Sequence, residues 1–178
     1  VLIDDFKGGF DATQHLIASG SKNIVQFSGP QALGLYKNRF EGYKAALREN
    51  NLPFSEEYII SSRLMEQDGI ENVKKIVTDN LDFDGIFSAN DVAAIGAIKY
   101  LTNNNVKIPE DVAIVGFSNE PISTVINPAL TTIDQPGFEM GKTATDLLLK
   151  HIKNQNGIKK SQTIIMDSNL IERQSSIK

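Results

Sequence analysis

The first two thirds of the chain alternate between short apolar runs and segments with helical periodicity. Apolar runs of strand length occur at residues 1–3, 24–27, 58–60, 85–88, 112–117 and 130–133. Between them, apolar residues recur every three or four positions, as at Phe40, Tyr43 and Leu47, which is the period of an amphipathic helix. A strand–helix order repeated about four times predicts right-handed βαβ units. We expect a three-layer α/β sandwich in which the strands near 24, 58, 85 and 112 are parallel in one sheet.

Turn and capping residues divide these elements. Gly8-Gly9 predicts a turn after the first strand, and Gly20 predicts the end of the helix that follows. Asp68 together with Glu71 predicts an N-cap and a capping box at the start of a helix. A further helix is expected from Asp91 to about residue 103.

The pattern changes after Pro136. Apolar residues at helical spacing predict a long amphipathic helix, with Met140, Ala144, Leu147 and Leu148 on its apolar side. A polar stretch at 153–160, a strand at 163–166 and a tail at 170–175 then complete the chain.

Composition and charge exclude several classes of function. The 178 residues carry a formal net charge of −4 and contain no cysteine, so disulfides and thiolate chemistry are excluded, and duplex DNA is a poor partner for this chain alone. No apolar run approaches the ~20 residues of a membrane span. Because the chain does not begin with Met and opens on a strand, we expect a fragment whose upstream part is missing.

Motifs for catalysis, nucleotides or metals are weak or absent. No serine lies in a G-x-S-x-G elbow, and Gly8-Gly9 lacks the nucleotide-binding fingerprint. Residues 80–91 imitate a calcium loop, but they include an apolar strand, so no metal site is expected. His15 adjoins an apolar helical face and is interpreted as a packed, hydrogen-bonded histidine rather than a base. The sequence predicts a binding protein, with no cofactor, rather than an enzyme.

Polar side chains follow two of the predicted strands. Asn90 and Asp91 come directly after the strand at 85–88, and Ser118 and Asn119 follow the strand at 112–117. In an open α/β sheet, ligands bind outside the carboxyl ends of the strands. These side chains are therefore candidates for ligand recognition.

Eight short motifs together resemble one known family. They occur in the family's order along the whole chain: IDD-x-x-GG at 3–9, HLI-x-x-G at 15–20, R-x-x-G-Y-x-x-AL at 39–47, DGIFSANDVAAIG at 84–96, IPEDVAIVGF at 108–117, P-x-LTTIDQP at 128–136, MG-x-x-A-x-x-LL at 140–148 and LIERQSS at 170–176. This set resembles the effector-binding domain of the lactose-repressor (LacI/GalR) family of transcription regulators.

The resemblance implies a type I periplasmic-binding-protein-like fold, present here mainly as its C-terminal lobe. Residues 6–133 with 168–178 would form that lobe, and 134–167 would be a segment of the N-terminal lobe reached across the hinge. The DNA-binding domain and the first βαβ units of the N-terminal lobe would lie outside this chain. Family members dimerise largely through the C-terminal lobe, which implies a homodimer. The apolar helix that starts at Asp91 could contribute to that interface, unless the sheet or the missing lobe covers its second apolar face.

The resemblance also implies seven ligand-binding residues. Arg39 matches the family arginine that forks onto ligand hydroxyls or carboxylates, although a surface ion pair at a helix start is the alternative. Asn90 matches a ligand amide and is equally a helix N-cap; the two roles can coexist. Ser118, next to Phe117, replaces a ligand-gripping aspartate of many members. The other three are Leu64, near a position often held by a stacking aromatic, and Asp4 and Gln135, which lie at the lobe crossovers as cleft or hinge residues.

These observations predict the cytoplasmic, ligand-sensing part of a LacI-family regulator. A small effector, expected to be a sugar, would favour one arrangement of the two lobes and so alter operator binding through the missing domain. The alternative is a periplasmic sugar-binding protein that feeds a transporter.

Overall fold

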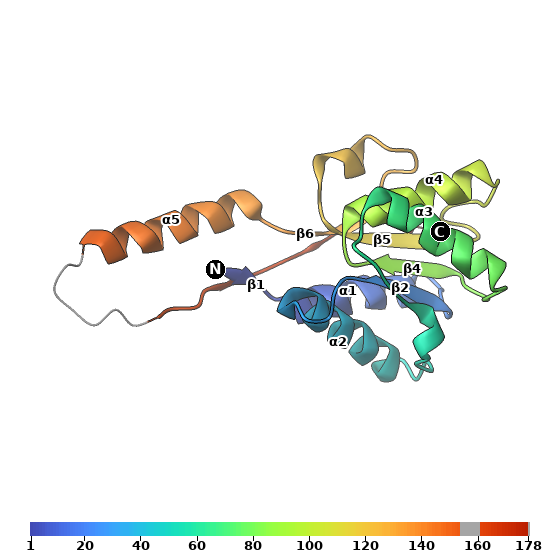
Figure 1. The fold of residues 1–178 in the computed structure, drawn as a ribbon, viewed down its shortest axis with the longest axis horizontal. Coiled ribbons are helices and arrows are strands. Elements are labelled where there is room, and N and C mark those ends of the chain that lie inside the picture. The colour runs from blue at the N-terminus through green and yellow to red at the C-terminus, as the bar shows by residue number, and fades with distance from the viewer. Residues whose placement is uncertain (154–160, 178) are drawn as a thin grey trace.

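The computed structural model describes residues 1–153 and 161–177 as a layered body and a projecting arm. The body contains a six-stranded sheet in the order β3-β2-β4-β5-β6-β8. The arm holds a separate two-stranded sheet, in which β1 (Leu2–Ile3) pairs with β7 (Ile165–Met166), and it also carries helix α5 (Gly137–Lys153) (Figure 1). Residues 154–160, most of the predicted polar stretch, lie outside the described residues.

Parallel pairing of the predicted strands is confirmed. Strand β2 (Ile24–Ser28) pairs in parallel with β3 (Ile59–Ser61) and with β4 (Gly85–Ser88), and β4 pairs in parallel with β5 (Ala113–Ser118). Strand β6 (Thr131–Asp134) extends the parallel order, and β8 (Leu170–Ile171) closes the edge antiparallel. The carboxyl ends of β2, β4, β5 and β6 therefore meet at one edge of the sheet.

Helices cover both faces of this sheet and give the three predicted layers (Figure 1). Helices α1 (Asp5–Ala18) and α2 (Gly34–Glu49) pack on one face, where Leu16 and Tyr43 join the core. On the other face, α3 (Glu66–Thr78) and α4 (Asp91–Asn103) contribute Val73 and Ile98 to a second core. Short 3-10 helices at Glu56–Tyr58 and Pro121–Thr124 lie in the connections.

The predicted turn at Gly8-Gly9 is wrong, because both glycines lie inside helix α1. A side chain on Gly9 would overlap the backbone carbonyl of Arg39, and one on Gly42 would overlap that of Phe6. The glycines thus allow the backbones of α1 and α2 to cross in direct contact. From its local sequence a glycine pair predicts a turn. Its role here depends instead on α2, a helix that follows later in the chain and crosses α1 at these glycines.

The predicted start of α3 is also wrong. The helix begins at Glu66, and Asp68 occupies its first turn, where its Oδ2 accepts a hydrogen bond from the backbone N of Met65 at 3.0 Å. Asp68 is therefore the third residue of the helix, whose side chain reaches back to the N-cap residue Met65, and it is not the N-cap itself. Glu71 takes no part in the cap and accepts a hydrogen bond from the side chain of Gln67. A carboxylate in the first turn also stabilises the helix through the helix dipole. The sequence therefore predicted a helix start with an acidic capping residue correctly but placed that start one turn too late.

The second apolar face of α4 is covered within the chain. Gly69 of α3 approaches the carbonyl of Ala93, and Gly96 of α4 approaches that of Glu66, so these two helices also cross closely. Ile95 and Ile98 are buried, and only Val92, in the first turn, is an exposed large apolar residue of the helix. This packing removes the reason for assigning α4 to an interface between subunits.

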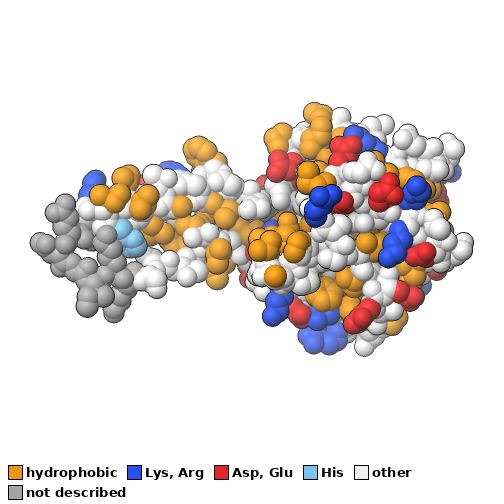
Figure 2. All heavy atoms as spheres, in the orientation of Figure 1, with side chains coloured by type: hydrophobic (Ala, Val, Ile, Leu, Met, Phe, Trp, Pro, Cys, Tyr) orange, Lys and Arg blue, Asp and Glu red, His pale blue; other side chains and the backbone are white. Residues whose placement is uncertain are grey.

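The arm exposes apolar side chains along its length (Figure 2). No described residue of α5 is buried, and the exposed fractions of Phe138 and Leu148 are 81% and 58%. Among the described residues, no helix is long and apolar enough to span a bilayer.

The C-terminal tail returns to the body and hydrogen-bonds to its core strands. Ser175 Oγ donates to the carbonyl of Ile114 at 2.6 Å and accepts from the backbone N of Thr131 at 2.8 Å. Ser176 Oγ lies 2.7 Å from Nε2 of His15. The interpretation of His15 as a packed, hydrogen-bonded side chain is thereby confirmed.

This histidine predicts a loss of stability in mild acid. Burial lowers the pKa of His15, with Glu172 opposing the shift, so the unfolded chain binds its proton more readily than the folded protein does. The contribution of neutral His15 to stability is therefore fully present above the pKa of the unfolded chain, about 6.5. It is lost as the pH falls through the pKa of His15 in the folded protein. We expect the free energy of unfolding, measured with urea from pH 7.5 to pH 5, to fall more steeply for the parent than for His15→Gln. Parallel declines would contradict this prediction.

Candidate ligand-binding site

A pocket of about 330 Å³ lies where the carboxyl edge of the sheet meets the arm. The body supplies residues from α1, α2, the start of α4 and the loop after β5, and the arm supplies residues from β1 and α5. Its lining consists of Leu2, Ile3, Asp5, Leu35, Tyr36, Arg39, Asn90, Asp91, Val92, Ser118, Glu120, Gln135 and Met140. Four of the seven predicted residues are thus brought together: Arg39, Asn90, Ser118 and Gln135.

Arg39 forms a buried ion pair at the floor of this pocket. Its Nε donates to Oδ1 of Asp5 at 2.8 Å, and its Nη2 lies 2.8 Å from the same oxygen. Nη1 donates to the carbonyl of Ala89 at 2.7 Å, and the guanidinium carbon lies 3.5 Å from the ring centroid of Phe117. Burial lowers the pKa of Arg39 and raises that of Asp5, and the pairing of the two charges opposes both shifts.

Asp5 is a pocket residue that the sequence analysis missed. The residue predicted instead was Asp4, whose carboxylate caps helix α1 by accepting from the backbone N of Lys7 at 2.9 Å. Asp4 is exposed and does not line the pocket, whereas Asp5 is 9% exposed. Both acids belong to the same motif, and only the direction of the helix distinguishes them.

Asn90 is a helix cap that also reaches the pocket. Its Oδ1 accepts from the backbone N of Ala93 at 2.9 Å, and its Nδ2 donates to the carbonyl of Leu64 at 2.9 Å. The predicted N-cap role is confirmed. An amide carries a second N–H and a second lone pair, so a ligand contact remains compatible with the cap.

Asp91 holds the loop after β5 in place. Its Oδ1 accepts from Oγ1 of Thr132 at 2.6 Å, and its Oδ2 accepts from the backbone N of Glu120 at 2.7 Å. Burial raises the pKa of this carboxyl, and these hydrogen bonds oppose the shift. These contacts give Asp91 a role in fixing the geometry of the loop.

The last residue of β5 and the first residue of that loop adopt backbone conformations unusual for side-chain-bearing residues. Ser118 has φ 116° and Asn119 has φ 52°. Asn119 Nδ2 donates to Oδ1 of Asp134 at 2.8 Å, and its Oδ1 accepts from Nη2 of Arg173 at 2.7 Å. Asn119 thus links the pocket rim to the crossover after β6 and to the C-terminal tail.

A comparison of two variants tests this loop. Asn119→Gly loses both side-chain links but keeps the left-handed backbone, whereas Asn119→Val loses the links and strains the backbone. A non-glycine residue forced into this region costs about 1–3 kcal/mol, so the valine variant should be less stable than the glycine variant by that amount. Urea unfolding of both variants measures the difference. Equal stability would show that the loop adopts another conformation.

Two further predicted residues, Leu64 and Phe117, do not line the pocket. The side chain of Leu64 is 1% exposed and packs in the core, so its expected place on the ligand-facing wall is not supported. Phe117 is buried beneath Arg39 and positions that guanidinium instead of lining the pocket. Gln135 lies half-buried at the crossover, with Oε1 3.5 Å from Oγ of Ser118. Whether any of the seven binds a ligand stays a prediction.

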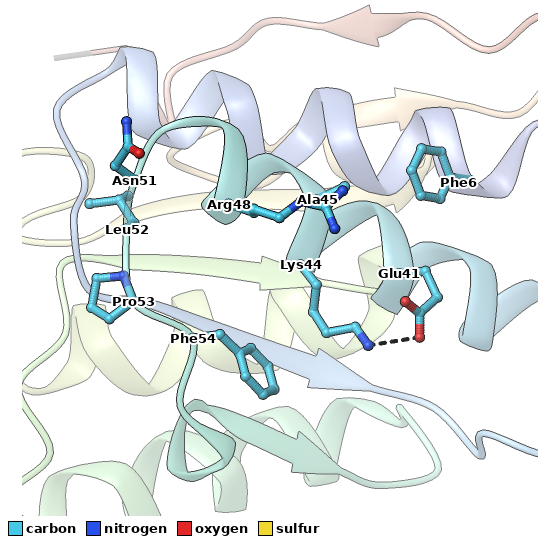
Figure 3. A pocket seen from close by; sticks show the side chains of 9 residues that line it. All are labelled: Phe6, Glu41, Lys44, Ala45, Arg48, Asn51, Leu52, Pro53 and Phe54. Carbon is cyan, nitrogen blue, oxygen red and sulfur yellow. Dashed lines mark ion pairs between the residues drawn. The ribbon is translucent and has the colours of Figure 1, made fainter.

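A larger hollow, of about 670 Å³, lies on the outer side of α2 (Figure 3). Its lining includes Phe6, Phe54 and Arg48, and its Glu41 and Lys44 form an ion pair with each other at 2.8 Å. It lies away from the carboxyl edge of the sheet and contains none of the predicted residues. Within the ranges that the structure describes, no group of three or more His, Cys, Asp or Glu could hold a metal ion.

Comparisons with known proteins identify the family. Residues 13–176 match the model of the periplasmic binding protein-like domain. The chain is 35% identical to the HTH-type transcriptional regulator MalR of Clostridium butyricum, over 98% of this chain and 51% of that protein. It is 34% identical to the HTH-type transcriptional repressor PurR of Actinobacillus pleuropneumoniae, over 98% of this chain and 52% of the relative. The chain thus spans about half the length of these curated relatives.

Solved structures of regulators from the same family have a similar fold. The transcriptional regulator CelR in complex with cellobiose superposes with a TM-score of 0.91 at 27% identity, over 97% of this chain and 52% of that chain. A LacI-family regulator from Enterococcus faecium with bound ribose gives a TM-score of 0.88 at 30% identity, over 98% of this chain and 63% of that chain. This chain belongs to the periplasmic binding protein-like domain family, in the form found in LacI-family transcriptional regulators. These relatives are regulators, not enzymes.

Proposed function

We propose that this chain is the ligand-sensing part of a LacI-family regulator and that its effector, a small carbohydrate, binds in the pocket between body and arm. The observation that carries the proposal is the composition of the pocket wall. Arg39, Asn90 and Ser118 come from the body, whereas Met140 and Leu2 come from the arm. Related regulators bind cellobiose and ribose, which supports a sugar as the class of effector.

A ligand in this position would favour one arrangement of two lobes. Residues 6–133 with 168–178 would form one lobe, and 134–167 would belong to the second. The connections run side by side, since Asp134 N donates to the carbonyl of Asn169 at 2.7 Å. A ligand that contacts both walls binds one relative orientation more tightly than another, and only that difference in affinity can shift the equilibrium.

The output of the sensor would lie outside this chain. We infer that a separate DNA-binding domain of the longer protein reads the operator in the cytoplasm, because the net charge of −4 makes this part a poor DNA ligand. We also infer a homodimer, since two DNA-binding modules with twofold symmetry match a pseudo-palindromic operator. The exposed apolar face of α5 supports a more complete second lobe in the longer protein. Sedimentation of that protein tests the dimer.

Calorimetry with a panel of neutral sugars, including ribose and cellobiose, tests the effector site. Gln135→Ala should weaken the binding of the effector by about 1–3 kcal/mol, because a ligand hydroxyl or its protein partner loses a hydrogen bond. Gln67→Ala is the matched control, since that glutamine is exposed on α3 and bonds only to Glu71 among the described residues. Binding that is unchanged by Gln135→Ala would remove the crossover from the site, and a panel without any binder would contradict the proposal.

A further inference from the structure

The groups in the pocket that could hold an anion are already engaged by the chain itself. Proteins bind anions with guanidinium groups, with N–H groups at helix N-termini and with N–H groups in loops. Here Asp5 pairs with Arg39 at 2.8 Å, the amide oxygen of Asn90 accepts from the first turn of α4, and Asp91 accepts from the backbone N of Glu120 at 2.7 Å. Each potential anion site thus has an internal acceptor.

The charged side chains of the wall reinforce this arrangement. Asp5, Asp91 and Glu120 line the pocket, and Arg39 is the only cation among the lining residues. Asp4 adds a further negative charge close enough to raise the pKa of Asp5. Asp5 and Asp91 are both buried, so water screens their fields less than those of surface carboxylates. An incoming phosphate or carboxylate would have to approach at least two buried acids.

The pocket still has polar groups that could form hydrogen bonds with the hydroxyl groups of a ligand. All three nitrogens of the Arg39 guanidinium lie within 2.8 Å of an oxygen of the chain, Nε and Nη2 at Oδ1 of Asp5 and Nη1 at the carbonyl of Ala89. Of its five N–H donors, one on Nη1 and one on Nη2 remain outside these contacts. Asn90 keeps a second N–H and a second lone pair, and Ser118 and Gln135 add further neutral polar atoms to the lining. These groups suit a ligand that both donates and accepts without carrying charge.

We propose that this pocket selects an uncharged polyhydroxylated effector and rejects the phosphorylated or carboxylated form of the same molecule. The inference rests on the proposed function and narrows its ligand class. Asp5 is the determinant: it neutralises Arg39, which would otherwise attract an anion. A cell using such a sensor would respond to a free sugar and not to the acidic or phosphorylated product made from it.

Matched ligand pairs test the selection directly. Titration calorimetry would compare ribose with ribose 5-phosphate, and cellobiose with cellobionate, at equal ionic strength. In any pair that binds, the anionic member should bind at least about tenfold more weakly, since like charges a few ångströms apart repel strongly in a partly dry site. An anionic member that binds as tightly as its neutral counterpart, or more tightly, would overturn the proposal.

A second experiment does not depend on any sugar. Inorganic phosphate should raise the melting temperature of Asp5→Asn more than that of the parent, because the substitution removes the negative charge that neutralises Arg39. Glu49→Gln, an equal charge change at an exposed position at the end of α2, controls for net charge and for the general stabilising effect of phosphate. Equal shifts in the three proteins would overturn the role of Asp5.

The two failures are distinguishable. If no sugar binds, the proposed function fails, while the phosphate comparison still decides whether Asp5 excludes anions. If Asp5→Asn does not fold, Glu120→Gln replaces it, because this rim carboxylate is exposed and its removal leaves the buried pair intact. That variant should bind inorganic phosphate several-fold more tightly than Glu49→Gln does, and equal binding would contradict the proposal.

Discussion

Alanine in place of Arg39 should lower the free energy of unfolding by about 3–5 kcal/mol, because it leaves a buried carboxylate without its partner. Arg39 is 4% exposed and Asp5 is 9% exposed, so water compensates neither charge. The substitution also removes the donor to the carbonyl of Ala89 and the guanidinium that lies over Phe117. Urea unfolding at pH 7 measures the loss, and a decrease below about 1 kcal/mol would contradict a buried pair.

A double-mutant cycle separates the pair from its surroundings. Asp5→Ala alone should also be costly, whereas Arg39→Ala combined with Asp5→Ala should cost less than the sum of the two single changes. The loss in Arg39→Ala should shrink as the pH falls, because burial raises the pKa of Asp5 and a protonated carboxyl no longer needs a cation. Arg39→Lys keeps the charge but loses the planar guanidinium group. Its free energy of unfolding should lie between that of the parent and that of the alanine variant.

The architecture could be predicted from the sequence because its signals are local. Apolar runs of strand length separated by helical segments permit little besides a parallel sheet with crossover helices, and β2, β3, β4 and β5 pair as expected. Asn90 and Ser118 could be placed at the site for the same reason, since a residue that follows a buried strand must lie at the carboxyl edge.

The errors occur where distant parts of the chain decide the outcome. Asp4 and Asp5 are neighbours of the same type, and the crossing of α1 with α2 places the second beside Arg39 while the first caps its own helix. Leu64 follows a strand but turns into the core, and its backbone carbonyl, which no side-chain pattern reveals, anchors Asn90. The partners of the C-terminal tail, such as Arg173 with Asn119, are likewise set by the fold and not by a motif.

Alanine at Gly9 should destabilise the protein although alanine is the better helix former. A methyl group at this position would overlap the backbone carbonyl of Arg39, which cannot move without shifting all of α2. Overpacking of this kind typically costs 1–3 kcal/mol and more where backbone is involved, against a gain in helix propensity of about 1 kcal/mol. We therefore expect a net loss of about 2 kcal/mol or more, together with weaker effector binding, because Arg39 lies at the contact.

Gly141→Ala is the matched control for that substitution. Gly141 lies inside helix α5, and a Cβ atom there would meet no atom within 4 Å. The same chemical change should thus leave the free energy of unfolding unchanged or raise it by up to about 1 kcal/mol through helix propensity alone. Urea unfolding and helical circular dichroism of the two variants measure the contrast. If both substitutions stabilised the protein equally, α1 and α2 would not cross in backbone contact, and the floor of the pocket would need a different construction.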